Sequence, residues 1–195
     1  GLLMLAAGNA DQKLVAELLN RGLDPKRLSK GGQNAVHHVA GIHFYHRDPF
    51  GSKEREQKLA QNIPGVLDLL NKSGAVTTLK DRDGDTSLHI AAAAGNVPAL
   101  KWLAAHYTRW DETNAKGETP LHLAATNGPI ESVEFLLPKV ANIDQPDFQG
   151  QTPLARAVAV DDRETIKLLI ERGADVNRTG ADDATILASV IAKGE

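Results

Sequence analysis

Residues 117–128 read GETPLHLAATNG, and the central part of this stretch recurs along the chain at a fixed spacing. The copies are TSLHIAA from Thr86, TPLHLAA from Thr119, TPLARAV from Thr152 and TILASVI from Thr185, each starting 33 residues after the one before. A constant period of about 20 to 50 residues is typical of repeat proteins, in which every repeat is one supersecondary unit. The sequence therefore predicts a solenoid of stacked units.

The residues of each copy predict the start of a helix. A threonine hydroxyl accepts a hydrogen bond from an unpaired N–H of the first helical turn, and proline is tolerated at the first helical position. Thr119 and Pro120 stand in this order, and the small residues Ala124 and Ala125 follow where neighbouring helices approach closely. VEFLL at 133–137 provides the apolar face of a second helix. Each unit is therefore predicted to be a helix pair.

Tight turns are predicted between the units. A small polar residue stands five positions before three of the threonines and a glycine two positions before them, as Asp81 with Gly84, Asn114 with Gly117, and Asp147 with Gly150. Both residue types favour turns. DRDGD at 81–85 also begins like a calcium loop, but that loop needs glycine at its sixth position and a carboxylate at its twelfth. Gly84 is fourth and Ala92 is twelfth, so we interpret the aspartates as turn residues.

These patterns resemble those of the ankyrin-repeat family, whose unit carries Asp-x-x-Gly-x-Thr-Pro-Leu-His and a later Gly-Ala-Asp-Val-Asn. GETPLHLAATNG and LLIERGADVN at 168–177 are close to that pattern. The resemblance implies an all-α repeat solenoid of stacked helix-turn-helix units with projecting β-turn or hairpin loops, in one domain over residues 1–195. We count six units at 1–33, 34–85, 86–118, 119–151, 152–184 and 185–195, the last truncated, and expect them to be part of a longer protein.

An insertion interrupts the second unit, because the step from Asn34 to Thr86 is 52 residues instead of 33. NIPGV at 62–66 matches NVPAL at 96–100, which places an insertion of 18 residues at 43–60. It contains four residues of the kinds that anchor protein interfaces, namely Phe44, Tyr45, Arg47 and Phe50. They form a possible second binding region. In the alternative interpretation the aromatic rings pack locally, and SKEREQKLAQ at 52–61 forms a solvated helical extension.

Several residues depart from the repeat pattern. Tyr107 and Val140 replace the glycine that follows the second helix, so those turns are expected to differ from the others. Ala155 and Arg156 stand where the motif places His and Leu, and the fifth unit is expected to be less regular, as is the sixth with its GADD at 180–183. Trp102 and Trp110 share slots with apolar residues of other units and are expected to pack in the core.

The composition excludes several classes of function. The chain of 195 residues has a net charge of -3 and no clustered Lys/Arg stripe, which argues against nucleic acid as a partner. It contains no cysteine, so disulfides and cysteine nucleophiles are excluded. No apolar run reaches the roughly 18 residues of a membrane span, so no membrane insertion is expected. An intracellular, cytoplasmic location is expected.

Neither a metal site nor a catalytic site is predicted. His37, His38, His43 and His46 lie close together in the sequence, as zinc ligands often do. However, His37 shares its motif slot with His89 and His122, and the resemblance implies that this histidine bonds neighbouring units. The other three lack a spacing fixed by a pattern. No nucleophile, zincin or phosphate-loop motif is present, so we expect neither an enzyme nor a cofactor.

The expected function is therefore a non-catalytic protein–protein interaction module that binds its partner through the concave face and the turn loops. The resemblance implies contacts from the variable turn residues and the end of the first helix. These are Arg82, Asp83, Asp85, Lys116, Glu118, Thr126, Asn127, Phe148, Gln149 and Gln151. We expect Phe148 to be the anchor, since a large apolar ring has little structural use in a turn; the alternative is that it packs on its own turn.

Two other functions stay open at this point. The chain could be the targeting segment of a larger multidomain enzyme or of a bacterial effector. It could also inhibit a transcription factor, because DGDTSLHIAAAAGN at 83–96 is similar to a repeat of inhibitor-of-NF-kappaB proteins. The sequence leaves the identity of the partner and the oligomeric state open.

Overall fold

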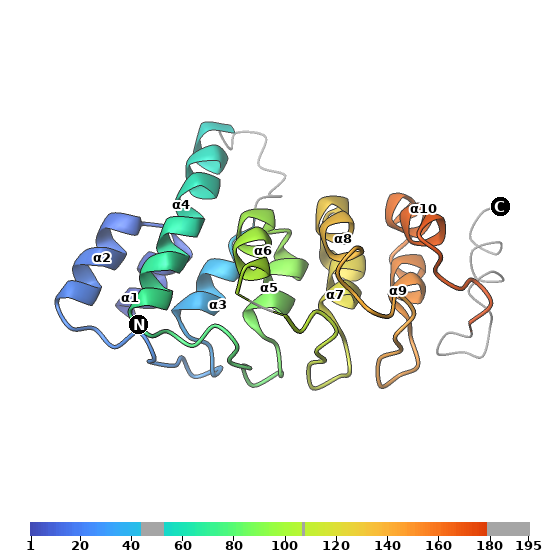
Figure 1. Ribbon diagram of the computed structural model, residues 1–195, viewed down its shortest axis with the longest axis horizontal. Helices are drawn as coiled ribbons and strands as arrows, with labels where there is room; N and C mark the ends of the chain where they lie inside the picture. The colour runs from blue at the N-terminus through green and yellow to red at the C-terminus, as the bar shows by residue number, and fades with distance from the viewer. Residues whose placement is uncertain (44–52, 107, 179–195) are drawn as a thin grey trace.

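A computed structural model describes residues 1–43, 53–106 and 108–178 of the chain, and this part contains ten helices and no strand (Figure 1). The helices are α1 (Leu2–Gly8), α2 (Gln12–Asn20), α3 (Ala35–Ala40), α4 (Lys53–Lys72), α5 (Ser87–Ala94), α6 (Val97–Ala104), α7 (Pro120–Asn127), α8 (Ile130–Leu136), α9 (Pro153–Ala159) and α10 (Arg163–Glu171). Successive helices pair as antiparallel neighbours, and the pairs stack along one axis. The fold is an all-α repeat solenoid, as predicted.

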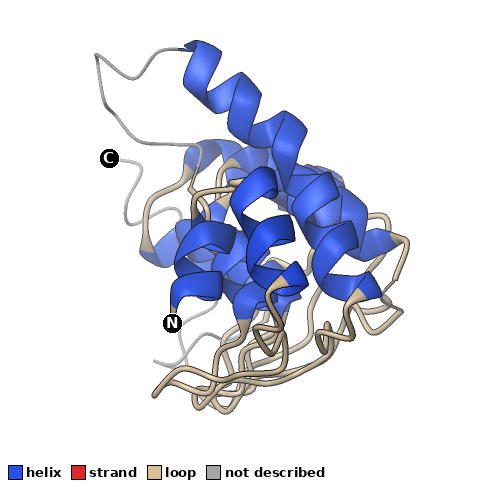
Figure 2. Cartoon of the chain, turned by 90° about the vertical axis from the view of Figure 1, so that its left-hand side faces the viewer, coloured by secondary structure: helices blue, strands red, loops and turns tan. Residues whose placement is uncertain are grey.

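Two layers of helices enclose the core. The first helices of the pairs contact one another in the order α1, α3, α5, α7 and α9, and the second helices do so in the order α2, α4, α6, α8 and α10. The long loops that join one pair to the next project to one side of both layers (Figure 2). Leu88, Leu100, Leu103 and Leu121 are almost completely buried between the layers. The stack thus buries apolar faces that a single pair would leave exposed.

Each first helix of units two to five begins at a side-chain cap. The hydroxyl of Thr119 accepts a hydrogen bond from the His122 N–H, and Pro120 is the first helical residue, as predicted. Thr152 has the same extended backbone and accepts a bond of 3.2 Å from Ala155 N–H. The helix start of the fifth unit thus keeps the cap and the proline but lacks the return bond that His122 makes to the Thr119 N–H, so it is less regular in this one bond, as expected. Residues 179–195, with the GADD segment and the sixth unit, lie outside the described residues.

The turn within a pair contains a left-handed residue in units one, three and five, whereas Gly128 at the same slot of unit four is extended, with φ -84°. Gly95 has φ 69° at this slot, and Ala10 and Asp161 adopt φ 49° and 58° at the equivalent slots. After the second helix, Gly22 and Gly173 are left-handed, as the glycine pattern predicts. Val140 is not left-handed, and its N–H donates to the Leu136 carbonyl instead, so this turn does differ as expected. Tyr107 lies outside the described residues.

Helix α4 stands above its neighbours in Figure 1. Residues 53–60 of the proposed insertion form its first turns and continue into residues 61–72 without a break, although Pro64 lies inside the helix. Asn62 Nδ2 donates to the Ala10 carbonyl (3.2 Å), as Asn96 Nδ2 does to the Val39 carbonyl (2.9 Å). Both asparagines thus contact the preceding unit, although Asn96 caps α6 and Asn62 lies within α4, and the 18-residue insertion stays a prediction. Phe44, Tyr45, Arg47 and Phe50 lie outside the described residues.

Both tryptophans pack as predicted. Trp102 is 8% exposed, donates from Nε1 to Asp68 Oδ1 at 2.7 Å, and stacks on the His106 ring with centroids 3.9 Å apart. Trp110 is half-buried against the core and meets the Phe135 ring edge-on at 6.3 Å. Their burial therefore accounts for both residues without a binding role.

Candidate protein-binding surface

Four turns with the same internal bonding project from the solenoid at 29–33, 81–85, 114–118 and 147–151, and we call them the finger turns (Figure 1). In the second, Asp81 Oδ1 accepts from the N–H groups of Asp83 and Asp85, each at 3.0 Å. Asp147 Oδ1 accepts in the same way from Gln149 and Gln151, at 2.8 and 2.9 Å. Both aspartates therefore shape turns, and the described residues contain no group of three or more His, Cys, Asp or Glu that could hold a metal ion.

Glycine is required in these turns for two reasons. Gly84 and Gly117 have φ 77° and 79°, which residues with a Cβ rarely adopt. A Cβ on Gly84 would also lie 2.5 Å from the backbone nitrogen of Ala115, and one on Gly117 would lie 2.5 Å from Cδ1 of Phe148. The glycines therefore allow each finger turn to lie directly against the next.

Backbone hydrogen bonds join the finger turns into a row. Arg82 N–H donates to the Gly31 carbonyl (2.9 Å), and Phe148 N–H donates to the Lys116 carbonyl (3.0 Å). Between them, Ala115 N–H donates to the Asp83 carbonyl (2.9 Å). The residues at the tips therefore sit on a backbone held from both sides, which limits the conformational entropy lost when a partner binds.

The motif histidines bond each first helix to the following loop. His89 Nδ1 accepts from its own cap, Thr86 N–H, at 3.3 Å, and Nε2 donates to the Glu118 carbonyl at 3.1 Å. His37 and His122 make the equivalent pair of contacts. Burial lowers the pKa of His89 to about 4 and also lowers the pKa of His37 and His122. The implied role of these histidines in bonding neighbouring units is confirmed, and it requires the neutral imidazole.

Arg156 ties two finger turns together from the inside. Its Nη2 donates to Glu118 Oε1 (2.8 Å) and to Asp147 Oδ2 (2.6 Å), and Asn114 Nδ2 reaches Glu118 Oε2 and Asp85 Oδ1, both at 2.9 Å. Burial alone would raise the pKa of Asp147, but the bonds from Arg156 and the backbone outweigh burial and lower it. Burial raises the pKa of Asp85, with the Asn114 bond opposing it. The atypical residue of the fifth unit is thus part of the turn scaffold.

The ten residues predicted to contact a partner differ in their exposure. Arg82, Asp83, Lys116, Asn127, Phe148 and Gln149 are exposed, and Asp85, Thr126 and Gln151 are half-buried. Glu118 is only 6% exposed. Its carboxylate is directed into the scaffold by Arg156 and Asn114, so we no longer assign it a partner contact.

Phe148 combines exposure with a fixed position. Its side chain is 77% exposed, the largest value among the exposed large hydrophobic residues of the described chain. The ring lies against the backbone of Gly117 in the preceding finger turn. A rigidly placed, solvated aromatic ring is the kind of side chain that anchors protein interfaces.

Sequence reasoning missed a set of exposed cations in the first loop. Lys26, Arg27 and Lys30 are exposed there and continue the exposed row of Arg82 and Lys116. A signal was present, because Lys30 stands four residues before Asn34, as Arg82 stands four residues before Thr86. The net charge of the whole chain, -3, gave no indication of these cations.

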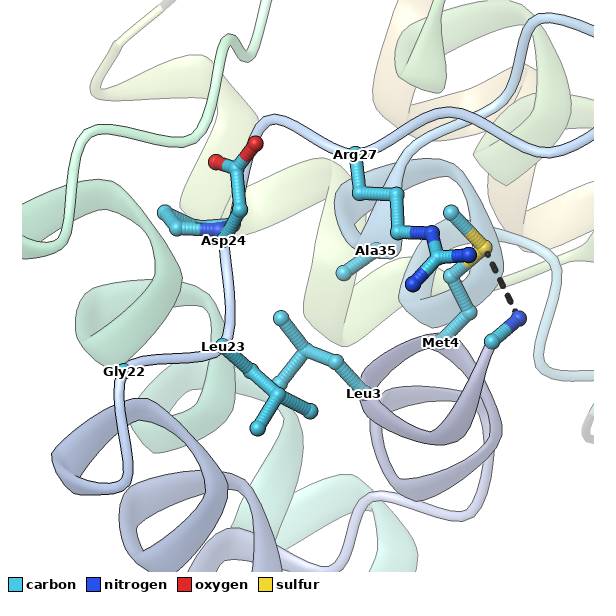
Figure 3. Close-up of a pocket in the computed structure, with 9 residues that line it drawn as sticks. Leu3, Met4, Gly22, Leu23, Asp24, Arg27 and Ala35 are labelled. Carbon is cyan, nitrogen blue, oxygen red and sulfur yellow. Dashed lines mark hydrogen bonds between the residues drawn. The ribbon is translucent and has the colours of Figure 1, made fainter.

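A small pocket lies beside these cations (Figure 3). It measures about 280 Å³. Its apolar walls come from Leu3, Met4, Leu23 and Ala35, and Asp24 and Arg27 also line it.

The described residues include no helix long and apolar enough to cross a membrane. The finger turns thus present a hydrogen-bonded backbone, exposed cations and the exposed Phe148 ring.

Comparison with known proteins agrees with this architecture. A family model described as "Ankyrin repeats (3 copies)" matches residues 59–147 and again residues 108–180. No curated protein matches the chain. Ankyrin repeats are generally protein–protein interaction modules, and domains built from them are typically non-catalytic and imply protein partners. The two matches together span more than half of the sequence, and the chain belongs to the ankyrin-repeat family.

Proposed function

We propose that the chain is a non-catalytic protein-binding domain of six ankyrin units that holds its partner on the finger turns and the adjoining ends of the first helices. The contact residues are Arg82, Asp83, Asp85, Lys116, Thr126, Asn127, Phe148, Gln149 and Gln151. The second unit carries the insertion at 43–60, which forms a second contact region through Phe44, Tyr45, Arg47 and Phe50.

The position of Phe148 carries this proposal. The turn is already closed by Asp147 and by the backbone bond to Lys116, so the ring is not needed to fold it. Leaving an aromatic ring 77% exposed gains no burial energy for the chain alone. A partner that covers the ring would recover that burial, which gives the side chain a use at this place.

Affinity capture from cell lysate with matched baits tests the proposal. The test bait carries Phe148→Ala with Arg82→Ala, and the control bait carries Ile170→Ala, which truncates another exposed apolar residue on the outer helix α10. We expect the test bait to lose a specifically captured protein by about tenfold or more, and the control to retain it. Equal capture by the wild-type chain and the test bait would refute the proposed surface.

A third bait examines the insertion. Removing residues 43–60 leaves Asn62 and its contact with Ala10, so the solenoid is expected to stay folded. A captured protein that is lost with this bait and kept with the double variant would place its contact on the insertion. Retention by the deletion bait would remove Phe44, Tyr45, Arg47 and Phe50 from the contact surface.

A further inference from the structure

The finger-turn loops separate their charges by burial. Their acidic side chains are mostly turned inward, where Asp85, Glu118 and Asp147 accept hydrogen bonds from Asn114 or Arg156. Asp81 accepts from two backbone N–H groups and from Gln33 Nε2, the latter at 2.9 Å. The acids thus hold the turns and are already occupied, which removes most of the negative charge from the outer surface.

The cations of the same loops are left outside, in a set that we call the basic edge. It consists of Lys26, Arg27, Lys30, Arg82 and Lys116, which are all exposed. None of the five forms an ion pair within the described part of the chain. A chain with a net charge of -3 therefore presents a positive edge along three consecutive loops, followed in the next loop by the Phe148 ring.

The repeat places these residues on successive turns, with Lys30, Arg82 and Phe148 in the same slot and Lys116 one residue later in its own turn. Lys30, Arg82, Lys116 and Phe148 lie on four successive finger turns, and packed helices of neighbouring units are about 8–10 Å apart. A polyproline II segment has three residues per turn and rises about 3.1 Å per residue, so side chains on one face recur about every 9 Å. A β-strand repeats every second residue, at about 7 Å, and fits the spacing less well.

From this match, and resting on the proposed function, we infer that the basic edge binds an acidic segment of the partner protein. The segment runs along the finger turns in an extended, polyproline II-like conformation with a carboxylate at every third residue. These carboxylates meet Lys30, Arg82 and Lys116 in turn, and an apolar residue after the last of them packs on Phe148.

A nucleic acid fits the basic edge less well than a peptide does. Asp24 and Asp83 are exposed among the cations and repel a backbone that carries a charge at every nucleotide. A peptide can place a neutral residue opposite each of them, and its apolar side chain matches Phe148. The carboxylates of Asp24 and Asp83 therefore favour a ligand whose negative charges are spaced apart over one that is charged at every unit.

The test uses labelled peptides of about 12 residues and fluorescence anisotropy with the intact chain. One peptide carries glutamate at every third residue and a final leucine, with alanine and proline between them. A second has the same composition with its glutamates adjacent, a third has lysine in place of glutamate, and a single-stranded oligonucleotide is the fourth ligand. Arg82→Ala with Lys116→Ala is compared with Lys72→Ala with Lys101→Ala, two exposed lysines of the outer helices α4 and α6.

We expect the spaced peptide to bind most tightly and to weaken as salt is added, because the contacts are between exposed charges. The edge variant should lose about tenfold or more in affinity and the control variant less than about twofold, with matching melting temperatures. Equal binding of the spaced and adjacent peptides, tighter binding of the oligonucleotide, or equal loss in both variants would overturn the inference.

The same reagents separate this inference from the proposed function. Suppose that capture of a cellular partner depends on Phe148 but the spaced peptide binds no better than the lysine peptide. The finger turns then bind a protein, as proposed, but the inference that they bind an acidic segment is wrong. If the spaced peptide binds as expected but capture of the cellular partner is unchanged by Phe148→Ala with Arg82→Ala, the proposed function is wrong. The basic edge then still prefers a spaced acidic peptide, but the captured partner does not bind there.

Discussion

Lowering the pH from about 7 to about 5 is expected to destabilise the solenoid through its buried histidines. In the folded chain the pKa of His89 is lowered from 6.5 to about 4, because burial disfavours the imidazolium. Its Nδ1 accepts the Thr86 N–H, so a proton there would also remove this bond. The neutral ring is therefore the form that holds the first helix of the third unit against the next loop.

The sign and the size follow from linkage. Between pH 6.5 and about 4 the unfolded chain binds a proton on His89 that the folded chain does not, so the free energy of unfolding falls as the pH falls through this window. From about pH 7 to about pH 5 the loss for this one residue is about 2 kcal/mol. The lowered pKa values of His37, His38 and His122 act in the same direction. The raised pKa of Asp85 acts in the opposite direction, because its folded form takes up a proton first.

Urea unfolding followed by far-UV circular dichroism at the two pH values measures this effect. His89→Gln should reduce the difference between the two pH values by about 2 kcal/mol, whatever its effect on absolute stability. A wild-type pH dependence in His89→Gln would refute the reasoning, because it would show that the buried ring is not the group that takes up the proton.

Four further substitutions probe the turns and the scaffold by urea unfolding. Gly150→Ala is expected to lower the free energy of unfolding by about 1 kcal/mol, because alanine is strained at its φ of 76°. Gly84→Ala should lower it by about 2 kcal/mol more, because the added Cβ would also meet the Ala115 nitrogen. Equal losses in the two variants would show that the neighbouring turns do not touch. Asp161→Gly should stabilise the chain by up to about 1 kcal/mol by relieving a φ of 58°, and a lower midpoint would contradict this. Arg156→Leu leaves two buried carboxylates without their cation and should cost about 3 kcal/mol, so a loss under about 1 kcal/mol would show that the pairs are not needed.

The binding residues were only partly accessible to sequence reasoning. The repeat slots located Arg82, Lys116 and Phe148 on projecting turns, because the Asp-x-x-Gly pattern defines where each turn begins and ends. The same slots also included Glu118, which is buried. The Glu118 side chain points inward because it pairs with Arg156, which lies 38 residues away in another unit. No local sequence pattern contains that information.

Local chemistry thus let the sequence alone determine the 33-residue phase, the helix starts at Thr86, Thr119 and Thr152, and the glycine turns. Capping and left-handed turns are decided within a few residues, so they can be predicted without the fold. Only the tertiary structure decided which charges face outward, because burial and pairing depend on neighbours one unit away. It alone showed that the acids hold the finger turns from inside and that the basic edge and the Phe148 ring remain on the surface.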